Sequence, residues 1–502
     1  MIPLLYHSTR GQTPPVPSAR AIELGLAPDG GLFLPDEIPA LSPGVLAGLC
    51  GLPYPELAAR VISLYLTDYG LDELRGYTEA AYGPDRFDDP AVAPLVALDE
   101  RTHVLELWHG PTAAFKDVAL QFMPHLLTSA MARAAGGGEV AILVATSGDT
   151  GKAALEGFRD VPGTRIAVFY PKGGVSRAQE LQMTTQAGAN TAVVAVEGNF
   201  DDAQTGVKAL FNDRALAGEL ASRGLRFSSA NSINWGRLVP QIAYYVHAYA
   251  ALVERGAVTL GRPVNICVPT GNFGNILAAY YARAMGVPAA RLICASNVNK
   301  VLTDFIATGV YDRRRTFYRT VSPSMDILVS SNLERLLYLL ADRDPARVRG
   351  WMAALAGTGS YDVGPEALRR LREVFWAGFA SEEETSAAIG RVWRERGYLL
   401  DTHTAVGWHV LEEYRRATGD ETPAILAATA SPFKFGRAVL RAIAGDDATA
   451  GRDELDLIAD LAERTGQSIP AGLRDLDKRP VRHRRWCKPE GMKDEVREIL
   501  GI

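Results

Sequence analysis

The chain has 502 residues, of which 47% are hydrophobic and 22% charged, a composition typical of a globular protein with roughly two to four domains. The formal net charge of −5 and the lack of any long run of Lys and Arg exclude an extended basic surface, so we expect no nucleic-acid partner. The sequence also lacks a signal-peptide pattern at its start and any apolar run of about 18 residues, which predicts a cytoplasmic protein with no membrane partner.

Cysteine and histidine patterns argue against disulfides and metals. The four cysteines are widely spaced and form no C-x-x-C pair, so they indicate a reducing compartment and not a disulfide framework. The eight histidines include no H-E-x-x-H and no pair four residues apart. We therefore predict no metal ion.

In chain order, the first distinct region is residues 1–95, which contains many prolines and the turn D-G-G at residues 29–31. These turn signals predict a separate N-terminal domain. The stretch H-G-P-T-A-A-F-K-D-V-A-L at residues 109–120 then places one lysine, Lys116, between a Gly-Pro turn and an apolar helix. Two interpretations stay open: a helix-start lysine whose ammonium reaches water, or an amine kept partly dry for chemistry.

From about residue 140, short β-branched runs alternate with helical stretches, which predicts an α/β fold with a mostly parallel sheet. The predicted strands are residues 140–145, 165–170, 191–196, 264–268, 292–295 and 424–428. Three of them end in loops rich in Gly, Ser, Thr or Asn, at residues 146–151, 270–275 and 429–432. Because ligands bind at the carboxyl ends of parallel strands, we expect these loops to share one rim.

The loop P-T-G-N-F-G-N at residues 269–275 opens a predicted helix. Its glycines allow successive N–H groups to point inward, and the helix N-terminus adds about half a positive charge, so the loop can hold a phosphate. A tight turn that needs glycine for conformation alone explains the pattern equally well.

The loop A-T-S-G-D-T-G-K-A at residues 145–153 matches an ATP-binding P-loop only in part. Thr146 stands where a Walker loop needs Gly, and Ala153 where it needs Ser or Thr, which excludes a kinase-type nucleotide site. What remains is an anion nest for a carboxylate or a second phosphate, or an N-capping loop in which Ser147 or Thr150 satisfies free N–H groups.

Residues 325–400 are rich in Leu, Ala, Arg and Glu and show no strand pattern, which predicts a helical insertion. Thr429 ends the last predicted strand, and Ser431 with Pro432 forms a conventional helix start. The charged tail after Asp453 is predicted to pack as peripheral helices.

A lysine held dry beside phosphate-binding loops has a lowered pKa and can form a Schiff base with an aldehyde. An aldehyde cofactor with a phosphate tail would explain both Lys116 and the loop at residues 271–275. Pyridoxal 5'-phosphate has this structure, and it acts as an electron sink that stabilises carbanions next to its imine. The residues alone raise it as a hypothesis.

Seven segments carry a family resemblance. They are H-G-P-T-A-A-F-K-D at residues 109–117, S-T-R-G at 8–11, G-L-A-P-D-G-G-L-F-L-P at 25–35, A-T-S-G-D-T-G at 145–151, G-N-F-D-D-A-Q at 198–204, N-S-I-N-W-G-R at 231–237 and S-P-S-M-D-I at 322–327. Together they resemble the longer-chain branch of the threonine synthase family, within the tryptophan-synthase-β-like enzymes. Residues 431–435 read S-P-F-K-F where many members have H-P-x-K-F, and the C-terminal tail has no recognisable counterpart.

The resemblance implies a fold-type II pyridoxal phosphate enzyme: an α/β fold with two open, mostly parallel α/β domains, an N-terminal domain and a helical insertion. The implied division is an N-terminal domain at residues 1–95, a cofactor-binding core at 96–324 with a smaller subdomain at about 125–245, the insertion at 325–400, and the rest of the core with C-terminal helices at 401–502.

Carried over position by position, the resemblance implies that Lys116 holds the cofactor as a Schiff base and moves protons on the substrate. The implied cofactor-binding residues are Lys116, Phe115, Gly271, Asn272, Phe273, Gly274, Asn275 and Thr429, in which the glycine loop binds the phosphate and Thr429 the pyridine nitrogen. The implied substrate-binding residues include Ser147, Gly148, Asp149 and Thr150, which would receive the substrate carboxylate or lie over the phenolic oxygen of the cofactor ring. Asn231, Ser232 and Arg237 would hold the substrate phosphate, with Ser176 and Gln179 as weaker candidates.

The implied reaction converts the small molecule O-phospho-L-homoserine, with water, to L-threonine and phosphate, in a monomer or homodimer. One alternative is a paralogue that acts on the same or a similar γ-substituted amino acid by γ-replacement or as a phospho-lyase that releases 2-oxobutanoate. Another is a non-catalytic binding protein, which the intact Lys116 and the two phosphate loops disfavour.

Overall fold

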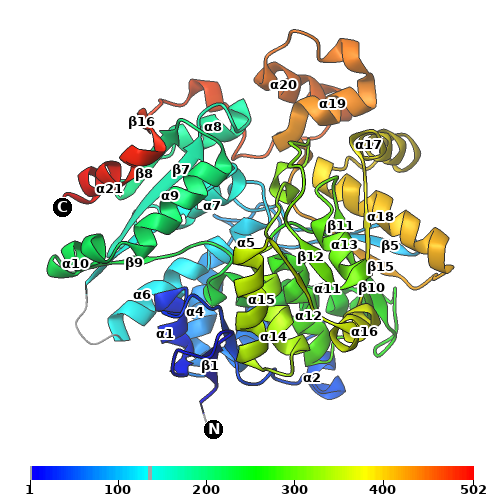
Figure 1. The fold of residues 1–502 in the computed structure, drawn as a ribbon. Helices are drawn as coiled ribbons and strands as arrows, with labels where there is room; N and C mark the ends of the chain where they lie inside the picture. The colour runs from blue at the N-terminus through cyan, green and yellow to red at the C-terminus, as the bar shows by residue number, and fades with distance from the viewer. Residues whose placement is uncertain (1–2, 134–137) are drawn as a thin grey trace.

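Two separate parallel sheets organise the computed structural model, which describes residues 3–133 and 138–502 (Figure 1). Residues 1 and 2 of the predicted N-terminal domain lie outside the described residues. The larger sheet has the order β14-β11-β10-β15-β5-β4, and only β4 runs antiparallel to its neighbour. Its strands are β4 (Leu95–Asp99), β5 (Thr102–Glu106), β10 (Val264–Pro269), β11 (Ala289–Ser296), β14 (Phe375–Phe379) and β15 (Ala424–Ala428).

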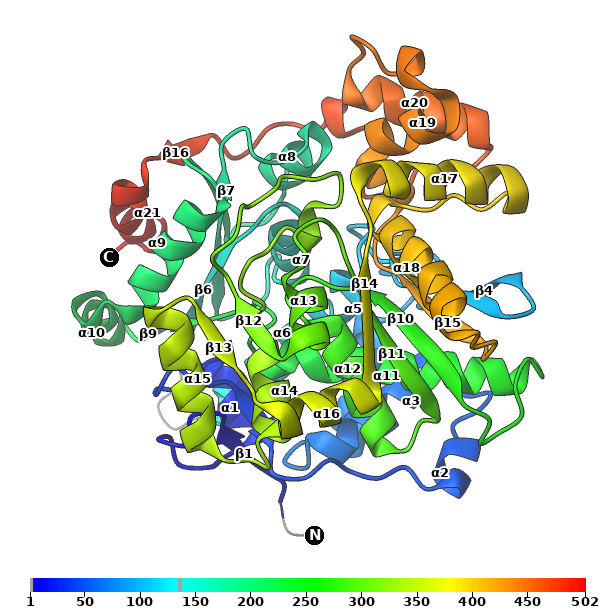
Figure 2. The same ribbon diagram turned by 45° about the vertical axis from the view of Figure 1, so that its right-hand side comes forward.

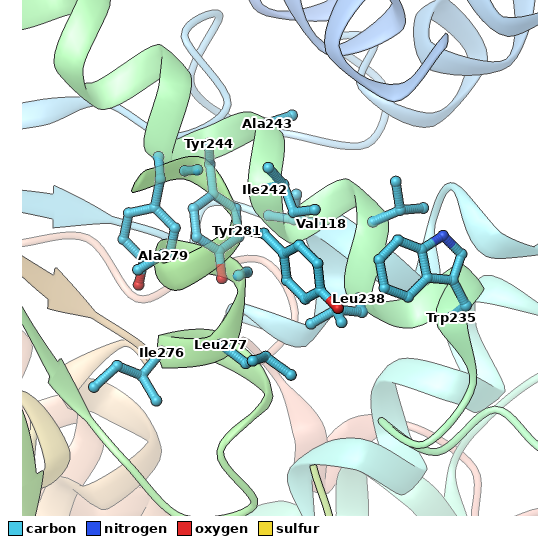
Figure 3. Close-up of a cluster of buried hydrophobic side chains, with 14 of the residues drawn as sticks. Val118, Trp235, Leu238, Ile242, Ala243, Tyr244, Ile276, Leu277, Ala279 and Tyr281 are labelled. Atoms are coloured by element: carbon cyan, nitrogen blue, oxygen red, sulfur yellow. The ribbon is translucent and has the colours of Figure 1, made fainter. Parts of the chain in front are cut away.

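Both faces of the larger sheet are covered, which explains why its central strands are apolar throughout. Side-chain alternation places Cys267 and Leu426 in a buried cluster with helix α18 (Thr402–Thr418). The neighbouring Ile266 and Ile425 point to the opposite face, into the core formed with α11 (Trp235–Glu254) and α12 (Gly274–Met285). Figure 3 shows the part of this core where α11 and α12 pack together, with Trp235 and Tyr244 from α11 and Leu277 and Tyr281 from α12.

The smaller sheet is parallel throughout, in the order β16-β8-β7-β6-β9. Its strands are β6 (Glu139–Ala145), β7 (Thr164–Pro171), β8 (Thr191–Val196), β9 (Leu225–Ser228) and β16 (Arg485–Cys487). One face packs on α9 (Phe200–Asn212), α10 (Arg214–Ser222) and α21 (Met492–Leu500), and α7 (Asp149–Gly157) and α8 (Arg177–Thr184) pack on the other side. All six predicted strands are confirmed, three in each sheet.

The N-terminal region packs on the main core. It contains the antiparallel strands β1 (Leu5–Ser8), β2 (Val16–Pro17) and β3 (Phe33–Pro35) and the helices α1 (Ser18–Leu24), α2 (Pro43–Ala47), α3 (Tyr54–Tyr65) and α4 (Leu71–Ala81). Helix α3 contacts α11, so the apolar side chains of this region belong to the main hydrophobic cluster. Helices α5 (Lys116–Leu120) and α6 (Met123–Arg133) follow. The division of the chain into domains at residues 95, 324 and 400 stays a prediction.

The segment at residues 325–400 is not purely helical, so the prediction of an insertion without strands is wrong in part. It contains α14 (Leu333–Leu340), α15 (Pro345–Gly357), α16 (Pro365–Val374) and α17 (Glu382–Arg396), but also β13 (Ser360–Asp362) and β14. Strand β13 pairs with β12 (Val310–Asp312), which follows α13 (Val301–Thr308), and β14 extends the larger sheet beside β11 (Figure 2). The aromatic run F-W-A-G-F forms a strand here because β11 offers a free edge.

The C-terminal tail connects the two sheets. Helix α19 (Gly436–Ala444) packs beside α17, and α20 (Glu454–Thr465) packs on α19. The chain then crosses to add β16 and α21 to the smaller sheet (Figure 1). Peripheral helices in this tail are thus confirmed, whereas strand β16 was not predicted. Among the described residues, none of the helices combines the length and apolar character that a membrane crossing requires.

Candidate active site

Lys116 is the first residue of α5, and the turn before it is fixed by the next side chain. The Asp117 carboxylate accepts hydrogen bonds from the Thr112 N–H (2.8 Å) and hydroxyl (2.7 Å). Gly110 is needed for this contact, because a Cβ there would lie 2.4 Å from the Asp117 Cβ. Ala113 takes a φ of +59°, which costs about 1 kcal/mol or more for a non-glycine residue. The backbone around Lys116 is therefore held in one conformation.

The amine of Lys116 is almost dry. The residue is 8% exposed, and its Nζ lies 3.4 Å from both the Asp149 Oδ2 and the Ser324 Oγ. Burial lowers the pKa of the amine, and the Asp149 carboxylate acts in the opposite direction. Of the two interpretations of this lysine, the structure supports the one in which its ammonium does not reach water.

Asp149 is the ionised partner of this amine. Burial alone would raise the pKa of its carboxyl group, but the charges of Lys434 and Lys116 outweigh that effect and hold the pKa well below its usual range. The Lys434 Nζ lies 2.7 Å from Oδ1, and Gln179 donates to the same oxygen at 3.1 Å. Because this side chain already carries a negative charge, we expect only the backbone N–H of Asp149 to attract a substrate carboxylate.

Thr429 lies next to the Lys116 segment. Its carbonyl oxygen accepts a hydrogen bond from the Phe115 N–H (2.9 Å), and Ala430 forms a bridge with Ala114. The Thr429 side chain is buried, and its hydroxyl makes no hydrogen bond within the described residues. The Phe115 ring lies 4.8 Å from the Lys116 Nζ. The predicted neighbours of the amine are thus brought together.

The glycine loop at residues 270–275 presents N–H groups with no protein acceptor. The carbonyl oxygens of Gly271 and Asn272 accept hydrogen bonds from Ser330 and Asn332, whereas none of the N–H groups of residues 271–275 donates to another described residue. Phe273 adopts a left-handed φ of +62°, which turns the backbone into the helix start. These are the features of an anion cradle.

The loop at residues 146–151 has only part of its N–H groups available. Thr146 Oγ1 accepts from the N–H of Gly148 (3.0 Å) and of Gly151 (2.8 Å), so these two are satisfied internally. The N–H groups of Ser147, Asp149 and Thr150 donate to no described residue. Gly148, one of the predicted carboxylate-binding residues, is therefore needed for the turn and not for its N–H. Its φ is +130°, and a Cβ at this position would lie 2.4 Å from the Gln179 side chain.

The two predicted phosphate sites are neighbours. A Cβ on Gly274 would lie 3.6 Å from the Ser232 Cβ, and the Asn332 amide joins both segments by donating to the Ser232 Oγ (2.9 Å) and the Asn272 carbonyl (3.0 Å). Arg237 is 2% exposed; its Nη1 donates to the Ala230 carbonyl (2.7 Å), but its buried Nε has no partner. Burial lowers the pKa of this guanidinium to about 10. A buried cation with an unused donor fits an anion.

Removing the Asn332 bridge should loosen this region. We expect Asn332→Ala to lower the free energy of unfolding by about 2–3 kcal/mol, because it also removes the acceptor of the buried Arg335 Nη1 (2.6 Å). Urea denaturation measures this effect. The matched control is Asn212→Ala, whose exposed amide donates only to the Lys208 carbonyl. Equal stability of the two variants would contradict the bridge.

Ser176 is committed to its own helix. Its hydroxyl accepts from the Gln179 N–H, and Gln179 Oε1 accepts from the Ser176 N–H, a reciprocal capping box at the start of α8. The Glu454 carboxylate accepts from the Arg177 N–H at 2.9 Å. With a carboxylate already at this helix start, Ser176 is a poor candidate for binding the substrate phosphate.

A cavity of about 1440 Å³ reaches this region from outside. Its wall includes Ser147, Gln179 and Lys434, next to the buried amine, and further out the side chains of Arg319 and Arg437. The site is thus bordered, at Ser147, Gln179 and Lys434, by a large opening between α8, α17 and α19. A ligand of amino-acid size has room to enter.

The three loops come from two sheets, so the prediction of one shared rim is wrong. Loops 270–275 and 429–432 follow the adjacent strands β10 and β15 of the larger sheet, but loop 146–151 follows β6 of the smaller one. They meet because the ion pair of Lys434 with Asp149 and the contact of Lys116 with Asp149 join the two sheets. The pattern of strands and loops cannot show which sheet a strand joins.

Several residues in this site were not predicted. They are Ser324, Asn332, His403 and Lys434. The Ser324 N–H donates to the His403 Nε2 (3.2 Å), and the His403 Nδ1 lies 3.0 Å from Asp401. For Ser324 and Lys434, the signal was present in the segments S-P-S-M-D-I and S-P-F-K-F.

Taken together, these residues fit one class of ligand: an aldehyde with a phosphate group. The buried amine can form a Schiff base, the loop N–H groups can hold a phosphate, and the Thr429 hydroxyl is free to bond a ring nitrogen. The carbonyl oxygens of the glycine loop accept hydrogen bonds from Ser330 and Asn332, which leaves the N–H groups of the loop for the phosphate.

Comparison with known protein families covers almost the whole chain. Residues 5–82 match the family model of the threonine synthase N terminus, residues 93–428 that of pyridoxal-phosphate dependent enzymes, and residues 404–494 that of the threonine synthase C-terminal region. The last match corrects the expectation that the tail has no counterpart.

Individual relatives agree with these models. Threonine synthase from Pseudomonas aeruginosa is 42% identical over 87% of this chain and 90% of its own length. Human threonine synthase-like 1 is also 42% identical, over 85% of this chain, which spans only 58% of the human protein. The crystal structure of PLP-bound threonine synthase from Brucella melitensis superimposes with a TM-score of 0.87 at 37% identity, covering 99% of both chains.

Proposed function

The chain belongs to the threonine synthase family of pyridoxal-phosphate dependent enzymes, and from this premise we propose that it converts O-phospho-L-homoserine and water to L-threonine and phosphate. The observation that carries the proposal is the Lys116 amine, buried at the meeting point of three loops and 3.4 Å from the ionised Asp149. A purely structural lysine would not need the free N–H groups and the unused Arg237 donor that surround it.

Pyridoxal phosphate, when bound, supplies an electron sink that stabilises negative charge on the substrate carbon next to a Schiff base. Lys116 would hold its aldehyde carbon and afterwards take and return protons at the substrate Cα and Cβ. The N–H groups of residues 271–275 would hold its phosphate, and the Thr429 hydroxyl would bond the pyridine nitrogen. Phe115 would lie beside the ring. Each role rests on the positions described above.

The substrate would be oriented by its two anionic groups. The N–H groups of Ser147, Asp149 and Thr150 would bind the carboxylate, and Asn231, Ser232 and Arg237 the phosphate that leaves from Cγ. Asp149 and Arg237 are buried and the other four residues are partly buried, which supports the assignment because hydrogen bonds to charged groups are stronger where water is restricted.

Replacing Arg237 should weaken phosphate recognition. We expect Arg237→Met to raise KM for O-phospho-L-homoserine by about 10- to 100-fold, because one charge-assisted hydrogen bond contributes about 1.5–3 kcal/mol. Product inhibition by inorganic phosphate should weaken in parallel. Initial rates measured with and without added phosphate test both effects.

Arg223→Met is the control, since Arg223 is exposed and donates to the Gly501 carbonyl at the far end of the smaller sheet. A change of KM in Arg223→Met as large as that in Arg237→Met, or an unchanged KM in the latter, would remove Arg237 from the substrate site.

The proposed reaction is tested by measuring phosphate release from O-phospho-L-homoserine together with amino-acid analysis of the same mixture. Threonine formed in step with phosphate supports the proposal. Phosphate with 2-oxobutanoate, or with a substituted amino acid when another nucleophile is supplied, would assign the chain to the alternative paralogue. No phosphate from a protein that binds the cofactor would mean that the substrate is a different one.

We also propose a cytoplasmic location and a monomer or homodimer. The four cysteines, three of them buried, are free thiols in the structure, which is typical of proteins in a reducing compartment. Cell fractionation tests the location, and light scattering of the purified protein gives its oligomeric state.

A further inference from the structure

Lys434 is a buried cation that the proposed reaction does not use. It lies in the 3₁₀ helix Pro432–Phe435, directly after the Thr429 loop, and its side chain is 0% exposed. Its Nζ lies 2.7 Å from the Asp149 Oδ1 and donates to the Thr112 carbonyl at 3.0 Å. Burying a lysine costs free energy unless it is paired, so we ask what the pairing of Lys434 with Asp149 contributes.

The reason lies in the charge count around Asp149. This carboxylate has a lysine on each oxygen: Lys434 at Oδ1 and Lys116 at Oδ2. With both lysines protonated, the three groups carry one net positive charge. When Lys116 loses its proton, Lys434 and Asp149 remain as a neutral pair. Without Lys434, the same event would leave the buried carboxylate with no paired cation, which is strongly unfavourable.

Other charged groups around the cluster do not replace Lys434. Arg237, from α11, adds positive charge near Lys116 but is not in contact with Asp149. The His403 Nε2, from α18, accepts the Ser324 N–H, and its effect on the Asp149 pKa is smaller than that of either lysine. Asp117, from α5, accepts two hydrogen bonds from Thr112 and feels the charge of Lys434, but as an acid it cannot supply the positive charge that pairs with Asp149.

We propose that Lys434 is a positioning residue that keeps Asp149 ionised and paired, so that Lys116 can give up its proton and act as a nucleophile and base. The inference rests on the proposed function only in that Lys116 is the reacting amine. It assigns a task to the lysine of the S-P-F-K-F segment: balancing the charge of Asp149 through each change in the protonation of Lys116.

The test measures the proton affinity of Lys116 without using the reaction. Cyanate carbamylates only the neutral form of an amine, because isocyanic acid adds across its N–H to give a urea. The full chain, cleared of bound aldehyde with hydroxylamine, is treated with cyanate at a series of pH values. Peptide mass spectrometry then gives the rate of modification at Lys116, which is divided by the concentration of isocyanic acid at each pH so that it reports the neutral fraction of the amine; the half-exposed Lys172 is followed in the same way as a reference.

We expect Lys434→Met to raise the pH of half-maximal Lys116 modification by about one unit or more, which is a tenfold or larger loss of the neutral amine at a fixed pH below the midpoint. Lys434→Arg keeps the cation and should leave the midpoint within a few tenths of a unit of wild type. An unchanged midpoint in a folded Lys434→Met protein would overturn the proposal.

Asp149→Asn tests the same balance from the opposite side, and it serves if Lys434→Met does not fold. Loss of the carboxylate leaves Lys116 facing Lys434 and Arg237 alone, so the midpoint should fall below that of wild type. A midpoint that stays or rises would overturn the proposal. Because the readout is chemical modification, these outcomes do not depend on whether the product is threonine.

Discussion

Lys116→Ala is expected to lower kcat for threonine formation by at least about 10⁴-fold, the largest effect of any single substitution in this chain. The amine is both the proposed attachment point of the cofactor and the proposed proton carrier, and no other described lysine can take over. Lys434 is held by Asp149 and Thr112, and Lys152 by Glu156 on α7. Steady-state kinetics measures the loss.

The same variant should also lose covalent attachment of pyridoxal phosphate. Borohydride reduction followed by mass spectrometry should place the cofactor on Lys116 in the wild type and find none on the variant. Lys172→Ala is the control, because its side chain is 51% exposed and pairs only with surface groups. Cofactor reduced onto another lysine, with threonine still formed, would contradict the assigned site.

Gly271→Ala is expected to have the next largest effect, a loss of cofactor affinity of about 100-fold or more. A Cβ at this position would lie 2.4 Å from the Ser324 backbone oxygen and 3.3 Å from the Met325 α-carbon. One of the two backbones must move, and both line the site: one presents the N–H groups and the other places Ser324 beside Lys116. Overpacking of this kind also costs about 1–3 kcal/mol of stability.

Fluorescence titration with pyridoxal phosphate gives the affinity of the variant, and thermal unfolding gives its stability. Gly44→Ala is the matched control, since a Cβ on Gly44 in α2 would meet no atom within 4 Å. If Gly271→Ala bound the cofactor as tightly as Gly44→Ala, the loop at residues 270–275 would not be the phosphate site.

Much of the fold could be predicted from local patterns. The α/β class, the mostly parallel pairing and six of the strands are confirmed, because buried parallel strands form continuous β-branched runs. The division into two sheets was implied only by the resemblance to the family. Strands β14 and β16 escaped prediction because each exists only through a partner far along the chain: β14 pairs with β11, and β16 with β8. Short segments of this kind carry no periodic signal of their own.

The candidate site shows the same division. Loops with a local signature, such as residues 270–275 and Lys116 with its neighbours, could be singled out from sequence, and the resemblance to the family assigned their roles, which stay predictions. Asn332 could not, because its role depends on Ser232 and Asn272, which lie 100 and 60 residues earlier in the chain. Lys434 was visible in a family segment, but its pairing with Asp149 needed the meeting of two sheets.

The most direct test of the proposed reaction is to run it in water enriched in ¹⁸O and to locate the label by mass spectrometry. If phosphate leaves from Cγ and water then adds at Cβ, the threonine hydroxyl gains one ¹⁸O and the released phosphate gains none. Label in the phosphate, with homoserine as the other product, would mean that water attacks phosphorus. That result would contradict the account, because it requires neither the Lys116 amine nor a cofactor.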